Sequence, residues 1–185
     1  FITDMGFETY QKILAEAMEE LGVESGMAPR GEKVNFTVDC TIETDQPAHI
    51  PDGYIDITAE KIRIYRQLDA IMSEKAMKRF RTEMTDRFGA FPEEVANLFS
   101  VVQIRNLGQT LGFEKIIVKN GIMICFFIAN PMSPFYKSKT FERVIENVSA
   151  NPALFTFKQV ENKLKVISRN INSLRDAFSV LQKLQ

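Results

Sequence analysis

The chain reads Lys115-Ile-Ile-Val-Lys-Asn-Gly-Ile-Met-Ile-Cys-Phe-Phe-Ile128, in which two apolar runs flank the dipeptide Asn120-Gly121. Asparagine and glycine tolerate the positive φ angles of a two-residue type I′ turn, whose twist matches that of the strands it joins. The flanking runs are rich in isoleucine, valine and phenylalanine, which favour strands. The sequence therefore predicts a β-hairpin made of residues 115–119 and 122–128.

Further along, Leu154 to Val160 and Leu164 to Ile167 form a second pair of strand-like runs that turns at residues 161–163. Apolar residues at three- and four-residue spacing predict helices around both hairpins. We expect these helices at residues 58–71, 73–88, 92–111, 134–150 and 171–184. Hairpins with short loops favour an antiparallel sheet covered by helices, so the predicted fold class is α+β.

Several residues mark helix ends. Ser73 is placed to cap the helix that runs to Phe88, and Gly89 is placed to stop it in the left-handed conformation. Pro92 falls in the first turn of the next helix, where a missing N–H is harmless, and Gly112 ends that helix. In the helix at residues 58–71 we expect an inward face made of Ile62, Tyr65 and Leu68.

The N-terminal region has a different pattern. Residues 7–21 predict an amphipathic helix, residues 24–31 read as a linker, and residues 34–42 alternate as a half-buried strand does. We therefore expect an appended helix over residues 1–23, a linker and strand over 24–50, and the principal domain over 51–185. Because the chain begins at Phe1 rather than at a methionine, we also expect it to be a piece of a longer protein.

Composition limits the possible functions. Hydrophobic residues make up 45% and charged residues 25%, as in ordinary globular proteins, and no apolar run is long enough to span a bilayer. The formal net charge is −1, whereas domains that neutralise phosphates usually carry a basic excess. We therefore expect little DNA binding, although a balanced total does not exclude a local basic face.

The chain offers few groups for catalysis or metal binding. Cys40, Cys125 and the single histidine His49 are too few for a structural zinc site, which needs about four ligands. We expect both cysteines to be reduced thiols, with Cys125 in a strand; their distance from His49 in the sequence does not itself exclude a Cys-His pair. Phosphate-binding loops, nucleophile elbows and zinc-protease motifs are absent from the sequence. No catalytic, cofactor or metal site is predicted.

One helix carries an acidic pair. Met77, Phe80, Met84 and Phe88 share the predicted inward face of the helix at 73–88, whereas Glu83 and Asp86 point away from it, about 60° apart. Two carboxylates on a rigid helix are suited to receive arginines from another protein surface. In the alternative interpretation, Arg79 and Arg87 pair with Glu83 along the helix, for about 0.3 to 0.5 kcal/mol, and the face is merely solvated.

A second group is basic. The C-terminal region contains Lys158, Lys163, Lys165, Arg169 and Arg175, which either solvate a strand edge or contact nucleic acid. The alternative function is therefore an accessory nucleic-acid-binding domain that uses the C-terminal strands and helix.

The chain resembles the C-terminal domain of bacterial transcription-repair coupling factors. The resemblance rests on Pro51-Asp52-Gly53-Tyr54-Ile55, on Asp86-Arg87-Phe88-Gly89-x-x-Pro92, on Ile104-Arg105 and Leu111-Gly112, and on Gly6-Phe7-x-x-Tyr10 near the start. It implies a parent protein that translocates on double-stranded DNA with ATP and magnesium, displaces stalled RNA polymerase and recruits excision repair in the cytoplasm.

For this chain the resemblance implies a non-catalytic regulatory module that binds no cofactor. It would fold back onto the parent's N-terminal UvrB-like module, mask the surface that binds UvrA and restrain the motor. The family's acidic pair falls on Glu83 and Asp86, which would meet arginines of that module. The resemblance thus favours the interface interpretation of these two carboxylates.

Overall fold

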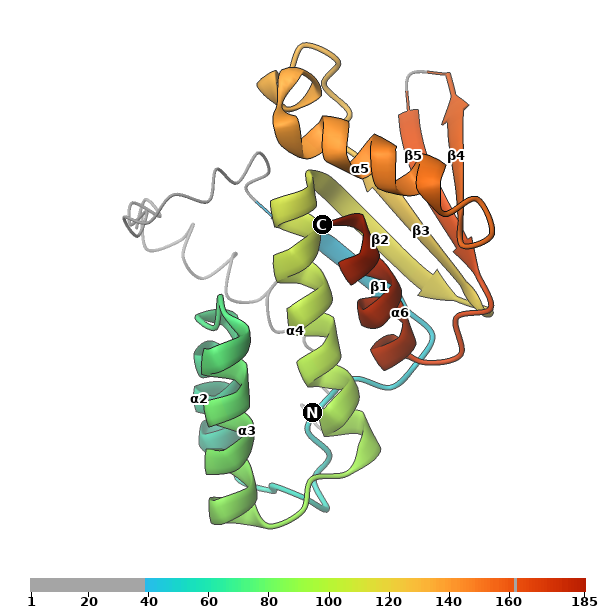
Figure 1. Ribbon diagram of the computed structural model, residues 1–185. Coiled ribbons are helices and arrows are strands. Elements are labelled where there is room, and N and C mark those ends of the chain that lie inside the picture. The colour runs from blue at the N-terminus through green and yellow to red at the C-terminus, as the bar shows by residue number, and fades with distance from the viewer. Residues whose placement is uncertain (1–38, 162) are drawn as a thin grey trace. The chain divides into compact units, whose positions relative to one another are not determined.

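The computed structural model describes residues 39–161 and 163–185, coloured by residue number in Figure 1. The described residues form two compact units, one made of residues 47–99 and the other of residues 39–46 with 100–185. The helix predicted at 7–21, the linker at 24–31 and the start of the strand predicted at 34–42 lie outside the described residues.

The first unit is helical. It contains α2 (Thr58–Asp69), α3 (Glu74–Phe88) and the first turns of α4 (Glu93–Leu111), as the sequence predicts. In α2 the buried side chains are Lys61, Ile64, Tyr65 and Leu68. The predicted inward position of Ile62 was wrong, since this residue is only half-buried. The stripe 61, 64, 65, 68 follows the helical repeat more closely, and the Lys61 ammonium pairs with Asp52.

Ser73 caps α3 as predicted: its hydroxyl accepts a hydrogen bond from the Ala76 N–H at 3.2 Å. We expect Ser73→Ala to lower the free energy of unfolding by about 1 kcal/mol, because it leaves a helix N–H without this acceptor. Urea unfolding measures the change. Ser73→Asp retains an oxygen acceptor and is the matched control; equal losses in both variants would contradict the capping role.

The second unit is built on a five-stranded sheet with the order β1-β2-β3-β5-β4. Its strands are β1 (Thr41–Thr44), β2 (Phe113–Lys119), β3 (Ile122–Phe127), β4 (Phe155–Val160) and β5 (Lys163–Arg169). Both predicted hairpins are confirmed as the antiparallel pairs β2–β3 and β4–β5. Asn120 and Gly121 have φ angles of 52° and 73°, as the predicted turn requires.

The prediction of a purely antiparallel sheet was wrong at β1, which pairs with β2 in parallel, whereas the class α+β is confirmed. A parallel pair needs a long crossover connection, and here the crossover contains α2, α3 and α4. Hairpin signals in the sequence are local, so they did not reveal this pairing.

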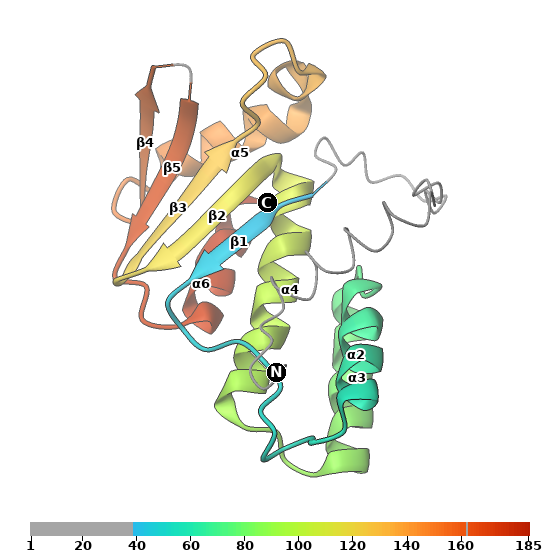
Figure 2. The same cartoon turned by 180° about the vertical axis from the view of Figure 1, so that it is seen from behind.

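Helices cover one face of the sheet (Figures 1 and 2). They are the second half of α4, α5 (Lys139–Ala150) and α6 (Leu174–Leu181), with the short 3-10 helices η1 (Pro134–Lys137) and η2 (Gln182–Leu184). Beneath them one row of side chains runs across four strands: Ile42, Ile116, Cys125 and Val166, all buried. An aromatic cluster closes the end of the core, with Phe127 against Phe113, Phe135 and Phe141 at centroid distances of 4.7, 5.8 and 5.6 Å.

Candidate functional site

Helix α3 is held rigidly by its inward face. Met77, Phe80 and Met84 are buried, as the sequence predicts. Phe80 also meets the ring of Phe99 edge-on at a centroid distance of 6.0 Å, a geometry favoured by aromatic pairs. A helix fixed on three buried side chains presents its outward residues in a defined geometry.

The C-terminal end of α3 is also anchored. The half-buried ring of Phe88 packs against Tyr54 at 6.1 Å, and the Tyr54 hydroxyl donates a hydrogen bond to the Gly89 carbonyl at 3.2 Å. Gly89 has φ 79° and ψ −168°, so the predicted positive φ is confirmed, whereas ψ lies outside the left-handed helical region. This combination of angles is almost restricted to glycine.

Glu83 and Asp86 lie on the exposed side of α3, as predicted from the helical repeat. They are three residues apart, a spacing at which side chains on a helix are neighbours. Within the part of the chain that the structure describes, neither carboxylate forms an ion pair or a hydrogen bond through its side chain. The pair therefore presents two negative charges to solvent.

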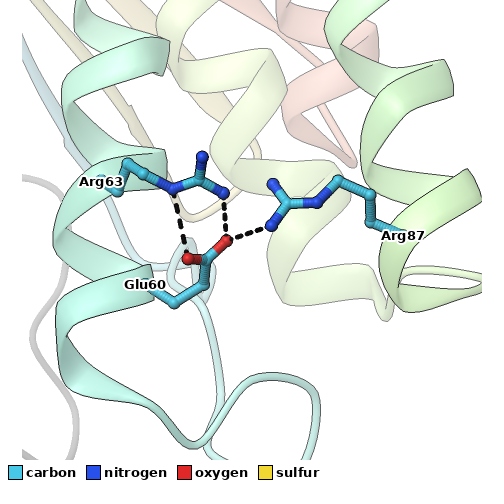
Figure 3. Close-up of polar contacts among 3 residues, drawn as sticks. All are labelled: Glu60, Arg63 and Arg87. Atoms are coloured by element: carbon cyan, nitrogen blue, oxygen red, sulfur yellow. Dashed lines mark hydrogen bonds and ion pairs between the residues drawn. The ribbon is translucent and has the colours of Figure 1, made fainter.

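Arg87, a candidate partner for Glu83 on the same helix, is directed away from the acidic pair. The Arg87 guanidinium pairs with Glu60 of α2 at 2.7 Å and lies over the Phe88 ring, with 4.7 Å between Cζ and the centroid. Arg63 binds the same Glu60 carboxylate, with 3.2 Å between Nε and Oε2 (Figure 3). Hydrogen bonds from Arg63 and, to a smaller extent, from Arg87 lower the pKa of Glu60. This cluster of Glu60, Arg63 and Arg87 was not predicted from the sequence.

The intrahelical pairing considered for Glu83 is therefore not observed. Arg79 is exposed and makes no ion pair with Glu83 among the described residues, and Arg87 is directed to Glu60. Two neighbouring carboxylates that pair with no cation of the described chain are able to accept bidentate hydrogen bonds from guanidinium groups, which are stronger than hydrogen bonds between neutral groups.

Both cysteines belong to the second unit and are buried, without a disulfide. Burial raises the pKa of the Cys125 thiol well above its usual range, and burial together with Asp39 raises the pKa of Cys40. Both side chains are therefore thiols at neutral pH, the less nucleophilic form. Across residues 39–161 and 163–185, no group of three or more His, Cys, Asp or Glu residues could hold a metal ion. Nor does any helix there combine the length and apolar character needed to cross a bilayer.

Residues 44–138 match the family model described as the TRCF domain. The chain belongs to the TRCF family. The matched segment begins at the last residue of β1, contains Glu83 and Asp86 on α3, and ends just after η1.

Transcription-repair coupling factors are similar to the chain in sequence. The protein from Rickettsia typhi is 32% identical over 133 residues, which cover 71% of this chain and 11% of that protein. The protein from Bacillus subtilis is 33% identical over 105 residues, 57% of the chain and 8% of the relative. For the protein from Borreliella burgdorferi the match reaches 94% of the chain and 16% of the relative, at 26% identity. This TRCF chain thus spans less than a fifth of the length of these relatives.

The fold agrees with this family. A crystal structure of the C-terminal domain of a transcription-repair coupling factor superposes with a TM-score of 0.66 at 16% sequence identity, covering 79% of this chain and 91% of that domain. The resemblance to the TRCF C-terminal domain that the sequence motifs indicate is therefore confirmed.

Proposed function

We propose that this TRCF domain is a non-catalytic regulatory module that docks through Glu83 and Asp86 onto the UvrB-like N-terminal module of its parent protein. In the docked state it masks the surface that binds UvrA and restrains the motor. Opening of the contact exposes that surface, so that excision repair is recruited only when the parent is engaged on DNA.

The observation that carries this proposal is the exposed acidic pair on a rigid helix. Folding does not use these charges among the described residues, because the adjacent Arg87 is bound to Glu60. An acidic pair fixed in this way is complementary to arginines on a partner surface, and such pairs fix the register of an interface and, when the charges are close, also contribute affinity.

In this proposal, DNA translocation and ATP binding belong to other parts of the parent protein. The parent would be an ATP-dependent translocase on double-stranded DNA that displaces stalled RNA polymerase in the cytoplasm. ATP and magnesium would bind the upstream motor. The regulatory module would restrain that motor through protein contacts.

Tethering makes a modest affinity sufficient for regulation. Two modules joined in one chain meet at an effective concentration of about 1 mM, so a Kd of about 10 μM between separate pieces would keep the parent about 99% closed. A contact of this strength is also reversible, because a competing interaction worth about 3 kcal/mol opens about half of the molecules and one worth about 5.5 kcal/mol opens nearly all of them.

The proposal is tested by titrating the 185-residue chain into the separately produced UvrB-like module in a calorimeter. We expect saturable binding, and we expect the chain to lower the affinity of that module for UvrA. If no heat is detected and UvrA binds equally well in the presence of the chain, the docking role is wrong.

A further inference from the structure

The sheet of the second unit has a second face, which none of the described helices covers and which is turned toward the viewer in Figure 2. The strand register places Thr41, Lys115, Phe126, Lys165 and Lys158 side by side in one row across this face. The next row consists of Glu43, Ile117, Ile124, Ile167 and Thr156, and a third contains Lys119, Ile122 and Arg169. We call the surface made by these three rows the open face.

The centre of the open face is apolar and its margin is basic. Ile117, Ile124 and Phe126 of the inner strands are half-buried although none of the helices in residues 39–161 and 163–185 lies over them. Toward β1, Glu43 pairs with Lys115 and Lys119. Toward β4, Lys158, Lys163, Lys165 and Arg169 form no ion pair with any carboxylate of the described chain. The β4–β5 hairpin thus presents uncompensated positive charge beside an apolar centre.

The arrangement of two of these lysines is unfavourable for folding. Lys158 and Lys165 stand directly opposite each other on β4 and β5, and like charges in that position destabilise a sheet. Protection of the sheet edge against aggregation explains Lys158 on the edge strand, but it does not require a second lysine on the inner strand. An anionic ligand would relieve the repulsion between them.

The net charge of the whole chain does not reveal that the unit carrying this surface is basic. Residues 34–46 and 100–185 contain twelve basic and eight acidic residues, a net formal charge of +4. Residues 1–33 and 47–99 contain eleven basic and sixteen acidic residues, a net charge of −5, so the total is −1. The near-neutral total therefore reflects two parts of opposite sign rather than an even distribution.

We propose that the open face binds single-stranded nucleic acid. Lys158, Lys165 and Arg169 of the open face contact the phosphates, together with Lys163, which lies two residues before Lys165 on β5 and therefore on the same face. Phe126 on the central strand accepts a stacked base. The Lys165 ammonium already lies 5.8 Å from the centroid of the Phe126 ring, so the aromatic surface and the positive charge belong to one site. Sheet-surface readers of single strands combine a basic track with aromatic platforms in the same way.

The apolar centre distinguishes this ligand from other polyanions. A duplex presents phosphates outward and keeps its bases stacked inside, so it would leave Ile117, Ile124 and Phe126 without partners. An acidic peptide would satisfy the lysines but offers no bases for Phe126. The proposal uses no residue of α3, and it therefore stands or falls separately from the docking function.

The experiment is a fluorescence anisotropy titration of the full 185-residue chain with labelled oligothymidylate and oligouridylate of about 16 nucleotides, a length that fills a typical single-strand site. Both probes are expected to bind, and their relative affinities distinguish DNA from RNA as the preferred strand. With about four phosphate contacts, affinity should fall about 50-fold between roughly 50 and 200 mM salt. Absence of binding at about 50 mM salt overturns the proposal.

Three variants locate the site. Lys158→Glu with Lys165→Glu should lower affinity at least about tenfold and reduce the salt dependence by about half. The charge-matched control, Lys139→Glu with Lys183→Glu, changes two exposed lysines on the helices of the same unit and should lower affinity less than about threefold. Phe126→Leu retains apolar bulk without an aromatic face and should lower affinity about tenfold.

The single variant Lys158→Glu separates binding from folding. Replacing the like-charge pair by an opposite-charge pair should raise Tm by about 1 to 3 °C while weakening oligonucleotide binding. Three outcomes would each overturn the proposal. They are an equal loss of affinity in the two double variants, tighter binding of a duplex of the same length than of the oligonucleotide, and displacement of the oligonucleotide by polyglutamate at equal charge concentration.

Discussion

Charge reversal of the acidic pair, Glu83→Arg with Asp86→Arg, is expected to weaken association of this chain with the UvrB-like module about 100-fold or more. Close charge pairs across protein interfaces couple by about 1.5 to 7 kcal/mol each, so the loss of two pairs costs at least about 3 kcal/mol. Reversal adds repulsion from the partner's arginines to the loss of attraction. Calorimetric titration of the two pieces measures the effect directly.

The fold should tolerate this change. Both side chains are exposed and make no side-chain hydrogen bond or ion pair among the described residues. The cost to stability is therefore limited to repulsion of the guanidinium introduced at position 83 by Arg79 and Arg87, a few tenths of a kcal/mol per pair. An unchanged circular dichroism spectrum and a Tm within a few degrees of that of the unaltered 185-residue chain would establish that the variant is folded. A loss of structure in the variant would make the titration uninformative, and the neutral pair Glu83→Gln with Asp86→Asn then provides the measurement.

A matched control is available on another helix. Glu142 and Glu146 of α5 are both exposed, and reversing them changes the net charge of the chain by the same amount. We expect this control to change affinity less than about threefold. If it weakens binding as much as the change on α3, or if the change on α3 has no effect, Glu83 and Asp86 are not the docking residues.

The same change has a consequence for the intact parent. If the separate pieces bind with a Kd of about 10 μM, a loss of about 100-fold brings the Kd to about the effective concentration of the tethered modules, and about half of the molecules open. UvrA should then bind the full-length variant without DNA engagement, which a pull-down with purified UvrA measures.

Local signals explain why much of the fold was predictable. A turn such as Asn120-Gly121 and a cap such as Ser73 depend on the conformations of a few neighbouring residues, so the hairpin and the helix start were correctly placed. The partner of β1 depends instead on a crossover of many residues, and nothing in the residues around Ile42 specifies whether β2 lies parallel or antiparallel.

In the candidate site, too, some features follow from local sequence and others depend on tertiary packing. Exposure of Glu83 and Asp86 follows from the helical repeat of α3 alone, because Met77, Phe80 and Met84 define the opposite face. The direction of Arg87 depends on how α2 packs against α3, which places Glu60 within 2.7 Å of its guanidinium. Sequence spacing offered only Glu83 as a partner, since contacts between helices have no fixed spacing along the chain.

Part of the open face could have been predicted from the sequence. Once the second hairpin is known to turn between Val160 and Lys163, counting outward pairs Lys158 with Lys165. That register would have revealed a like-charge pair among basic residues for which the sequence left both a solvated edge and a nucleic-acid contact open. The neighbouring Phe126 required the pairing of β3 with β5, which joins strands from different hairpins.

The second large effect concerns Gly112, at the junction of α4 and β2. Gly112→Ala is expected to lower the free energy of unfolding by about 2 to 4 kcal/mol. The residue has a φ of 81°, which an alanine adopts only with strain, and an added Cβ would lie 2.2 Å from Cε2 of the buried Phe135 ring. Phe135 also packs against Phe127 and Phe141, so the ring has little room to move.

Gly121→Ala is the control for the backbone contribution. Gly121 has a similar φ of 73°, but its added Cβ would meet no atom within 4 Å, so only the conformational strain remains, about 1 kcal/mol. Urea unfolding of the two variants separates strain from steric overlap. Gly112→Ala should also cost less when it is introduced into Phe135→Leu than when it is introduced into the unaltered chain, because the shorter side chain no longer obstructs the added Cβ. Equal destabilisation at Gly112 and Gly121 would show that the ring of Phe135 does not restrict the junction, and that the aromatic cluster adapts to an added methyl group at no cost.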